Sequence, residues 1–411
     1  MKKPIREMLR EERDFYILVF AMFIGTLAGP TVFVVLPLYF RNLGLTTAEI
    51  GIIVSLNGIG GIFAGLIAGK LSDMVGRKPV TVAGWICYLI PCLILLLSKE
   101  KIFFYIALTL IGVATQMFLT AQYAFIADVF PPERRGGAFG LYQSIAIGMS
   151  TMIGQVLFVG YIYNVLGAGV YFILLASCHV IAGLIVLFFV KEKKRHDTKQ
   201  VNIAEIPATN LRTFKRFNFK LSNPHFSRLF IIFMVASIVR SLYQMAQPIF
   251  PIFLSNLGIS VSEVSIIYSS ASIVSMITPI IFGKLSDKFG RKKLLILGTL
   301  IAGIYALQGF WTLTFSQALT MKLFDALSLA IITPISLAFL TELLPPSQKG
   351  LGIGLYNSIL RLDSSALGAV GGILVQLYGF NVLFLVGIVA SIISSVIILI
   401  YIPEKHKILE S

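Results

Sequence analysis

Five charged side chains lie within stretches of sequence that are otherwise apolar, and they are the residues best suited to chemistry. They are Arg240, Lys322, Asp325, Arg361 and Asp363. A charge inside hydrocarbon costs at least ~2.5–3.5 kcal/mol, so such residues usually serve a function. A buried carboxylate can take up and release a proton. The basic side chains can bind an anion or neutralise the acids, and a purely structural pair that fixes helix packing is the alternative.

The elements that must position these charges are membrane-spanning helices. Of 411 residues, 57% are hydrophobic and 13% are charged, against roughly 25% charged in ordinary soluble domains. Apolar runs of ~20 residues or more recur, and each can cross a bilayer as a helix. The runs are continuously apolar rather than alternating, which argues against strands. The sequence predicts an all-α membrane protein with twelve transmembrane helices: 15–40, 46–68, 80–98, 102–127, 138–166, 168–190, 227–255, 261–282, 294–315, 317–341, 351–377 and 380–402.

The chain contains a long internal repeat. Residues 283–292 nearly duplicate residues 69–78, which sets an offset of 214 positions, and this offset holds without a gap from Pro37 to Gly154. Such a duplication in a very apolar chain indicates two homologous membrane halves, as in secondary transporters. We predict two pseudo-symmetric six-helix bundles joined by a basic cytoplasmic linker, with bounds 1–190, 191–226 and 227–411.

The formal net charge of +15 is distributed unevenly along the chain. With the N-terminus in the cytoplasm, all but six of the 34 lysines and arginines fall on the cytoplasmic side. Arg41, Lys99 and Lys101 fall on the external side of the membrane, and the other three lie within the predicted spans. This positive-inside pattern predicts cytoplasmic termini for a multi-pass protein of the plasma (inner) membrane. Topology therefore explains the basic charge, and no nucleic-acid partner is expected.

Both copies of the repeated segment have the form Gly-x-Leu-x-Asp-x-x-Gly-Arg-Lys, at 69–78 and 283–292. This signature, the six-plus-six spans and the long central loop resemble the major facilitator superfamily over nearly the whole chain. Complete copies in both halves resemble its drug–proton antiporter branch. The resemblance implies a gating motif that holds the cytoplasmic side closed; its residues are Gly69, Asp73, Gly76, Arg77 and Asp128, and in the second half Gly283, Asp287, Gly290, Arg291 and Glu342.

Each residue type in the motif has a physical reason. Gly69 and Gly76 are expected to allow a very tight turn. The resemblance implies that Asp73 faces the positive N-terminal end of span 11, and Asp287 that of span 5. It also pairs Arg77 with the acid that ends span 4, and the second-half arginine with the acid that ends span 10. The alternative is that the motif only fixes the conformation of its loop and takes no part in gating.

The resemblance also implies that spans 1, 4, 7 and 10 line the substrate cavity, which places Arg240, Lys322 and Asp325 there. Our hypothesis is that Asp325, or failing that Asp363, carries a coupling proton. The basic residues, including Arg361, would bind substrate anions or pair with the acids. Neutral amides in the first half are interpreted mainly as bridges between helices; they are Asn57, Gln116, Gln122, Gln143 and Gln155.

These features predict a secondary active transporter that works by alternating access, with proton-coupled efflux of small amphipathic molecules as the first choice. A proton-coupled carrier of a small organic anion is the alternative, and a non-transporting membrane sensor is a third reading. Leu108 replaces the arginine that drug–proton antiporters usually carry in span 4. No catalytic constellation stands out, so we expect no enzyme activity, no cofactor and no metal. The expected partners are a small-molecule substrate, protons and the lipid bilayer, and a monomer is expected.

Overall fold

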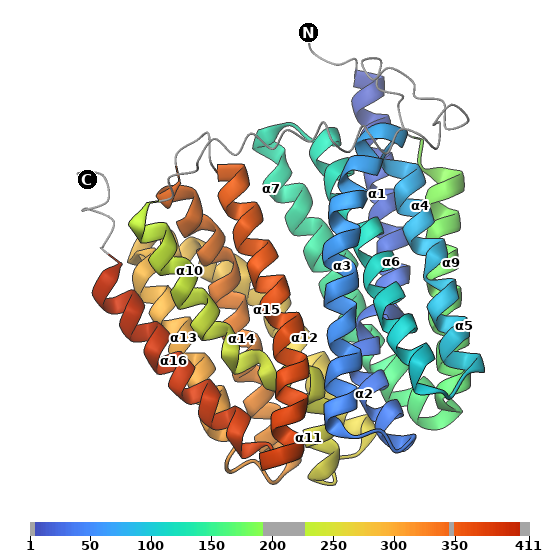
Figure 1. Ribbon diagram of the computed structural model, residues 1–411. Helices are drawn as coiled ribbons and strands as arrows, with labels where there is room; N and C mark the ends of the chain where they lie inside the picture. Colours follow the sequence, from blue (N-terminus) through green and yellow to red (C-terminus); the bar gives the residue numbers. More distant parts are fainter. Residues whose placement is uncertain (1–4, 192–226, 345–348, 403–411) are drawn as a thin grey trace, which may run out of the picture.

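The computed structural model describes residues 5–191, 227–344 and 349–402, apart from some side chains within helices. Every regular element among these residues is a helix (Figure 1). The first half comprises α1 (Ile5–Ala28), α2 (Val32–Asn42), α3 (Thr47–Val75), α4 (Arg77–Cys87), α5 (Leu89–Leu97), α6 (Lys101–Val129), α7 (Pro132–Leu141), α8 (Ser150–Gly154) and α9 (Gly167–Phe189). The second half comprises α10 (Arg228–Ser241), α11 (Phe250–Asn256), α12 (Val261–Phe289), α13 (Arg291–Gln308), α14 (Phe315–Leu343), α15 (Lys349–Tyr378) and α16 (Asn381–Tyr401).

Short segments of tighter or wider helix continue some of these elements. A 3-10 turn at Gly29–Thr31 joins α1 to α2, and another at Leu242–Ile249 joins α10 to α11. Two π-helical segments, Tyr142–Met149 and Gln155–Leu166, flank α8. We call each continuous series of such segments a rod. One rod consists of α1, its 3-10 turn and α2, a second of α10, its 3-10 turn and α11, and a third of α7, α8 and the two π-helical segments.

The predicted all-α membrane architecture is confirmed. Nine stretches among the described residues are long and apolar enough to cross a membrane, and one of them, Arg134–Phe189, covers two predicted spans. Two further predicted spans correspond to α13 and α15, which are 18 and 30 residues long. The span predicted at 294–315 was too long. α13 ends at Gln308, and the chain leaves the helix at Gly309 before Thr314, in an extended conformation, caps α14.

The two ends of the molecule are defined by glycines with positive φ. Gly76 (φ 108°) and Gly290 (φ 88°) lie in the two copies of the motif, and we call this the motif end. Gly44 (φ 83°) and Gly258 (φ 76°) lie at the opposite end, the far end. The expectation for Gly69 was wrong. It lies inside α3, which continues to Val75, so Gly76 alone makes the turn there.

Capping boxes fix the far-end starts of α3 and α12. The Thr46 hydroxyl accepts a hydrogen bond from the Glu49 N–H, and the Glu49 carboxylate accepts one from the Thr46 N–H at 2.8 Å. Ser260 and Glu263 repeat this arrangement at the same 2.8 Å distance. Reciprocal capping satisfies two N–H groups that have no partner within the helix. The pseudo-symmetry of the chain thus extends to its hydrogen bonds.

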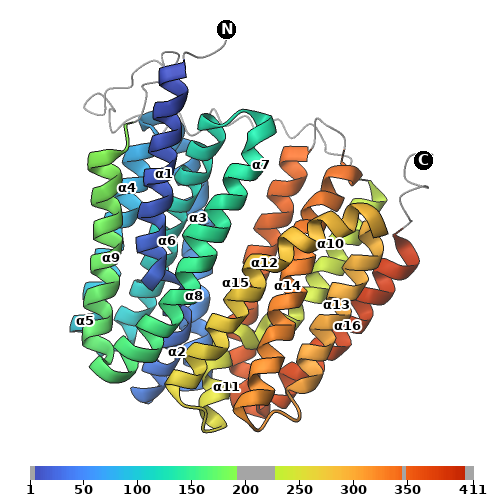
Figure 2. The same ribbon diagram turned by 180° about the vertical axis from the view of Figure 1, so that it is seen from behind.

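The two halves meet at the far end and diverge toward the motif end (Figures 1 and 2). At the far end, Arg41 donates a hydrogen bond to the Ile252 carbonyl at 3.1 Å, and Asn164 donates one to Ser262 at 3.0 Å. At the motif end, a Cβ added to Gly140 of α7 would meet no described atom within 4 Å. We use the term open toward the motif end for this arrangement, in which the halves are together at the far end and apart at the motif end.

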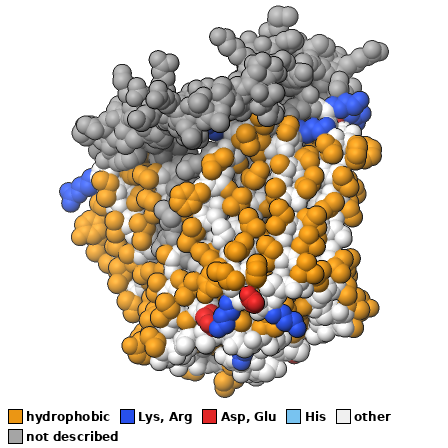
Figure 3. Space-filling view, turned by 45° about the vertical axis from the view of Figure 1, so that its right-hand side comes forward, with side chains coloured by type: hydrophobic (Ala, Val, Ile, Leu, Met, Phe, Trp, Pro, Cys, Tyr) orange, Lys and Arg blue, Asp and Glu red, His pale blue; other side chains and the backbone are white. Residues whose placement is uncertain are grey.

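Apolar side chains cover the outer surface of the helices. Figure 3 shows them across the middle of one face, with charged side chains gathered near the ends of the molecule. Such a belt matches a hydrocarbon layer of ~30 Å. The linker predicted at 191–226 lies outside the described residues beyond Lys191.

Candidate functional site

The rod that carries Arg240 is interrupted between α10 and α11. The 3-10 segment at Leu242–Ile249 contains Pro248. Proline lacks an N–H, and its ring collides with the carbonyl four residues earlier, so an α-helix cannot continue regularly there. The interruption brings Gln247 against α14, where its Oε1 accepts a hydrogen bond from Lys322 Nζ at 2.6 Å.

Lys322 and Asp325 form a buried ion pair on α14. Their Nζ and Oδ2 atoms are 2.9 Å apart, and their side chains are only 7% and 3% exposed. The three-residue spacing places both on the same helix face. The Lys322 ammonium also lies over two aromatic rings, 4.7 Å from the centroid of Tyr268 and 5.1 Å from that of Phe250. Carboxylate, amide oxygen and two ring faces therefore surround one ammonium group.

Several polar atoms beside this pair are buried without a hydrogen-bond partner. Oδ1 of Asp325 is one of them; the others are the hydroxyl of Tyr305 and Nε2 of Gln247, while the nearby Tyr243 hydroxyl interacts with Ser328 and Gln244. Both tyrosines interact electrostatically with Asp325. A buried polar group without a partner costs about 1–3 kcal/mol, so their presence together makes this a candidate functional site. Asp325 thus has one oxygen held by Lys322 and one oxygen available.

The other charged residues singled out in the sequence differ in how far the structure describes them. Arg240 is 6% exposed and interacts electrostatically with Tyr243. Among the described residues, no ion pair to Arg240 is formed. Arg361 and Asp363 belong to α15, but their side chains lie outside the described part of the chain. The structure therefore brings Lys322 and Asp325 into contact, and Tyr243 interacts with both Arg240 and Asp325.

A cavity of about 450 Å³ lies between the two halves. Its first-half wall comes from α2, α3 and α6, and its second-half wall from the 3-10 segment after α10 and from α12. None of the described residues in the lining is charged. The polar members of the lining are Ser55, Asn57, Thr115, Gln116, Gln247 and Tyr268.

The ion pair lies directly behind this wall. Gln247 and Tyr268 line the cavity on one side and contact the Lys322 ammonium on the other. A molecule in the cavity therefore meets neutral polar and aromatic groups first. The three charged residues expected to line a cavity, Arg240, Lys322 and Asp325, are not in the described lining of this one, and Lys322 and Asp325 lie behind Gln247 and Tyr268.

The sequence interpretation gave too little weight to neutral residues of the first half. Asn57 and Gln116 line the cavity, although amides were interpreted mainly as bridges between helices. Helical spacing was the available signal: Asn57 and Gly61 lie four residues apart on α3, and Gly112 and Gln116 four apart on α6. Small and polar residues at this spacing form one face of a helix.

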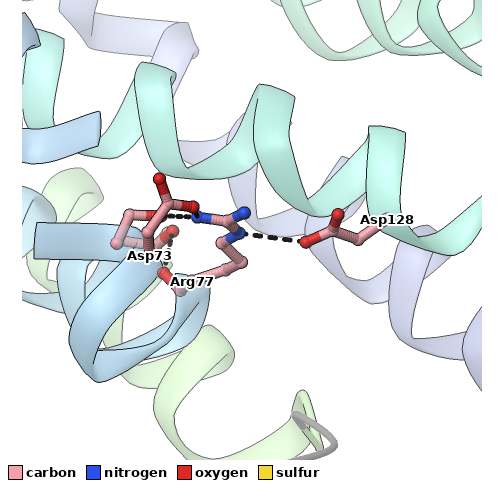
Figure 4. A network of polar contacts seen from close by, with 5 residues as sticks. Asp73, Arg77 and Asp128 are labelled. Carbon is pink, nitrogen blue, oxygen red and sulfur yellow. Dashed lines mark hydrogen bonds and ion pairs between the residues drawn. The ribbon is translucent and has the colours of Figure 1, made fainter. Parts of the chain in front are cut away.

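The first copy of the repeated motif forms a compact polar network at the motif end (Figure 4). Arg77 begins α4, and its guanidinium donates to Ser72 at 2.8 Å, to Asp73 at 2.6 Å and to Asp128 at 3.0 Å. It thereby joins the end of α3 to the end of α6. Asp73 is 64% exposed and is held by an arginine four residues away. The ion pair expected between Arg77 and Asp128 is present.

The second copy repeats the central ion pair. Arg291 lies 2.7 Å from Glu342, and it also donates to the Ala338 carbonyl at 2.7 Å. Gly283 and Asp287 lie within α12, but the Asp287 side chain is outside the described part of the chain. In each half, the motif arginine thus connects the start of its own helix with the end of a later one: α4 with α6 in the first half, and α13 with α14 in the second.

Comparison with known proteins adds three findings. A family model described as the Major Facilitator Superfamily matches residues 18–246 and again 229–410. Multidrug resistance protein 2 of Bacillus subtilis is 26% identical over 387 residues, which cover 92% of each chain. The multi-drug resistance efflux pump PmrA of Streptococcus pneumoniae is 26% identical over 268 residues, or 64% of each chain.

A solved structure has the same fold. It is a bacterial homolog to the human lysosomal transporter Spinster, in an inward-facing and unoccupied conformation. The TM-score is 0.73 with 16% sequence identity, and the superposition covers 97% of both chains. At this identity the similarity extends to the fold alone.

Proposed function

Because this chain belongs to the major facilitator superfamily of membrane transporters, we propose that it exports small amphipathic molecules in exchange for protons. The cavity between the halves carries this proposal. Its volume of about 450 Å³ is in the range of drug-sized sites. Its described lining combines apolar side chains such as Phe33 and Leu119 with neutral amides and hydroxyls. Such a wall accepts molecules that are largely apolar with one polar or charged group.

The relatives support the same class of substrate. Two of them are described as multidrug resistance or efflux proteins. A wall built from neutral groups and aromatic rings is compatible with many ligands, because no fixed charge imposes one geometry. Selectivity would then depend on the ion pair behind the wall.

Proton coupling is assigned to the pair on α14. Asp325 has one unpartnered oxygen next to Lys322, so the pair can change its protonation when a ligand enters the cavity. Asp363 is the second candidate for the coupling proton. Export requires the cavity to open to each side in turn, and the present arrangement is open toward the motif end.

The positive-inside pattern assigns the motif end and both termini to the cytoplasm. The transporter would then take substrate from the cytoplasm or the inner leaflet of the plasma (inner) membrane. Arg77 and Arg291 anchor the motif loops, and the exposed Asp73 would dock against the other half when the motif end closes. The motif would thereby stabilise the outward-open state.

The alternative is a carrier of a small organic anion. The observation that favours it is the charge balance: Arg240 and Lys322 are buried near a single described acid, Asp325. An anion entering the cavity would be attracted by this excess of positive charge.

Transport by inside-out membrane vesicles tests the proposal. With an acidic lumen, vesicles that contain the protein should accumulate a lipophilic cation such as tetraphenylphosphonium, and a protonophore should abolish the uptake. Asp325→Asn should lower uptake at least tenfold, whereas Lys99→Gln, in an exposed far-end loop, should leave it unchanged. Uptake of organic anions instead, lost in Arg240→Ala, would replace the proposal with the anion carrier.

A further inference from the structure

The Lys322 ammonium occupies a site built to bind a cation. Its contacts are the Asp325 carboxylate at 2.9 Å, the Gln247 amide oxygen at 2.6 Å, and the rings of Tyr268 and Phe250 at 4.7 and 5.1 Å. Ring faces and a carboxylate are the groups that bind substituted ammonium ligands in proteins. Each group that holds Lys322 would equally hold the positive group of a cationic substrate.

This site adjoins the cavity. Gln247 and Tyr268 belong to the cavity wall and also contact the ammonium. A cationic group that enters the cavity therefore meets two of the four groups that bind Lys322. The third, Asp325, lies behind these two groups and has one oxygen without a hydrogen-bond partner.

The net charge of the buried groups around Lys322 determines what must happen when a cation enters the site. The described groups near Lys322 or its partner Asp325 are Tyr243 in the segment after α10, Tyr268 on α12 and Tyr305 on α13, and Arg240 on α10 interacts with Tyr243. Helix α15 also packs against α14, but the side chains of its Arg361 and Asp363 are outside the described residues. Among the described groups, and with the tyrosines neutral, two positive charges oppose one negative charge. A third positive charge in this buried space is strongly unfavourable unless one of the first two is lost.

Of the two buried bases, lysine is the one that can lose its proton. A lysine deprotonates when its surroundings disfavour the charge, whereas an arginine stays charged in proteins. Loss of the Lys322 proton as the cation binds would leave the net charge of the site unchanged.

We propose that Lys322 is a tethered cation that occupies the substrate's cation site in the empty transporter, and that a cationic substrate displaces it and releases its proton. The proposal rests on the proposed export of amphipathic molecules and identifies the charge of the substrate and the group that gives up the proton. The step is balanced: the Lys322 Nζ–H bond breaks, the electron pair stays on nitrogen, and the proton passes to water in the cavity. The substrate takes the place of the ammonium on Asp325 and is not itself changed.

Equilibrium binding of tetraphenylphosphonium to the purified full-length protein, measured between pH 6 and pH 9, tests this. Release of one proton per bound cation makes the affinity of the wild type rise with pH, by up to about tenfold per pH unit. Lys322→Gln should bind the cation at least as tightly as the wild type does at pH 9, with no dependence on pH. Asp325→Asn should bind weakly throughout, and Lys99→Gln should match the wild type.

Lys322→Arg provides a second test that keeps the ion pair and therefore the fold. An arginine at this position cannot release its proton, so this variant should bind the cation at least tenfold more weakly than the wild type at pH 9, again without pH dependence. If Lys322→Gln or Lys322→Arg keeps the wild-type pH dependence, another group releases the proton and the inference is wrong, although export of cations still stands. If the wild type binds organic anions and no cations, the proposed function itself fails.

Discussion

Replacing Gly51 with alanine should shift the transporter away from the arrangement that is open at the motif end. Gly51 lies on α3 where this helix crosses α15 of the other half. An added Cβ would lie 2.5 Å from the Gly368 carbonyl oxygen and 2.9 Å from the Gly372 Cα. Both neighbours are backbone atoms, which cannot rotate away. The clash therefore exists only while the halves are together at the far end.

The magnitude follows from these distances. Ordinary contact begins at 3.4 Å, so the two helices must separate by about 0.9 Å to accept the methyl group. Overpacking of this kind costs about 1–3 kcal/mol. Because the cost applies to one conformation only, the ratio of far-end-open to far-end-closed molecules should rise by about 5–150-fold.

Distance measurements between spin labels can detect this shift. Lys99 and Leu313 are equivalent positions in exposed far-end loops of the two halves, and labels there should move apart as the far end opens. The three native cysteines would first be replaced. Gly136→Ala is the matched control, since its Cβ would meet no described atom within 4 Å.

Gly112 allows a comparison with Gly51, because its contacts lie within one half. A Cβ at Gly112 on α6 would collide with the Asn57 carbonyl of α3, and both helices belong to the first half. Gly112→Ala should therefore lower the melting temperature in every conformation without changing the label distances. If Gly51→Ala does the same, with label distances as in the wild type, the far-end crossing does not control the conformational equilibrium.

Two further predictions concern stability. Arg77→Ala should reduce the free energy of unfolding by about 1–2 kcal/mol, because its partly buried guanidinium bridges two carboxylates. Calorimetry in detergent would measure this loss. A loss below about 0.5 kcal/mol would show that the network contributes no more than an ordinary surface ion pair. Thr46→Ala and Ser260→Ala should each cost about 1 kcal/mol, since each removes a hydroxyl that accepts a hydrogen bond from the N–H three residues later, at the same 3.3 Å distance. Clearly unequal losses in melting temperature would contradict this equivalence.

The fold could be predicted from the sequence because the signals that specify it are local and repeated. Runs of apolar residues fix the spans, and the 214-residue offset fixes the two halves. The limits of the helices were less certain. Gly69 looked like a turn residue, yet α3 runs through it, because a helix tolerates glycine and only Gly76 needs positive φ.

The site could be predicted only in part. Lys322 and Asp325 were recognisable because charge is rare in apolar sequence, and their spacing indicated a shared helix face. Their position behind Gln247 and Tyr268 depends on the interruption after α10 and on the crossing of α12, which are relations between distant segments. Neutral cavity residues such as Asn57 carry no comparable signal, because amides are common at helix contacts.

The two halves derive from one repeat but differ in charge at equivalent positions. The offset of 214 aligns Lys322 with Leu108 and Asp325 with Ile111, and both apolar residues are 1% exposed in the first-half core. The first half therefore has no charge at the place where the second half has its ion pair. An ionised pair at both places would require two sets of compensating contacts in hydrocarbon. Confining the charge to one half leaves the other free to supply a neutral wall, so that the change of protonation proposed at Lys322 would act on the cavity from one side only.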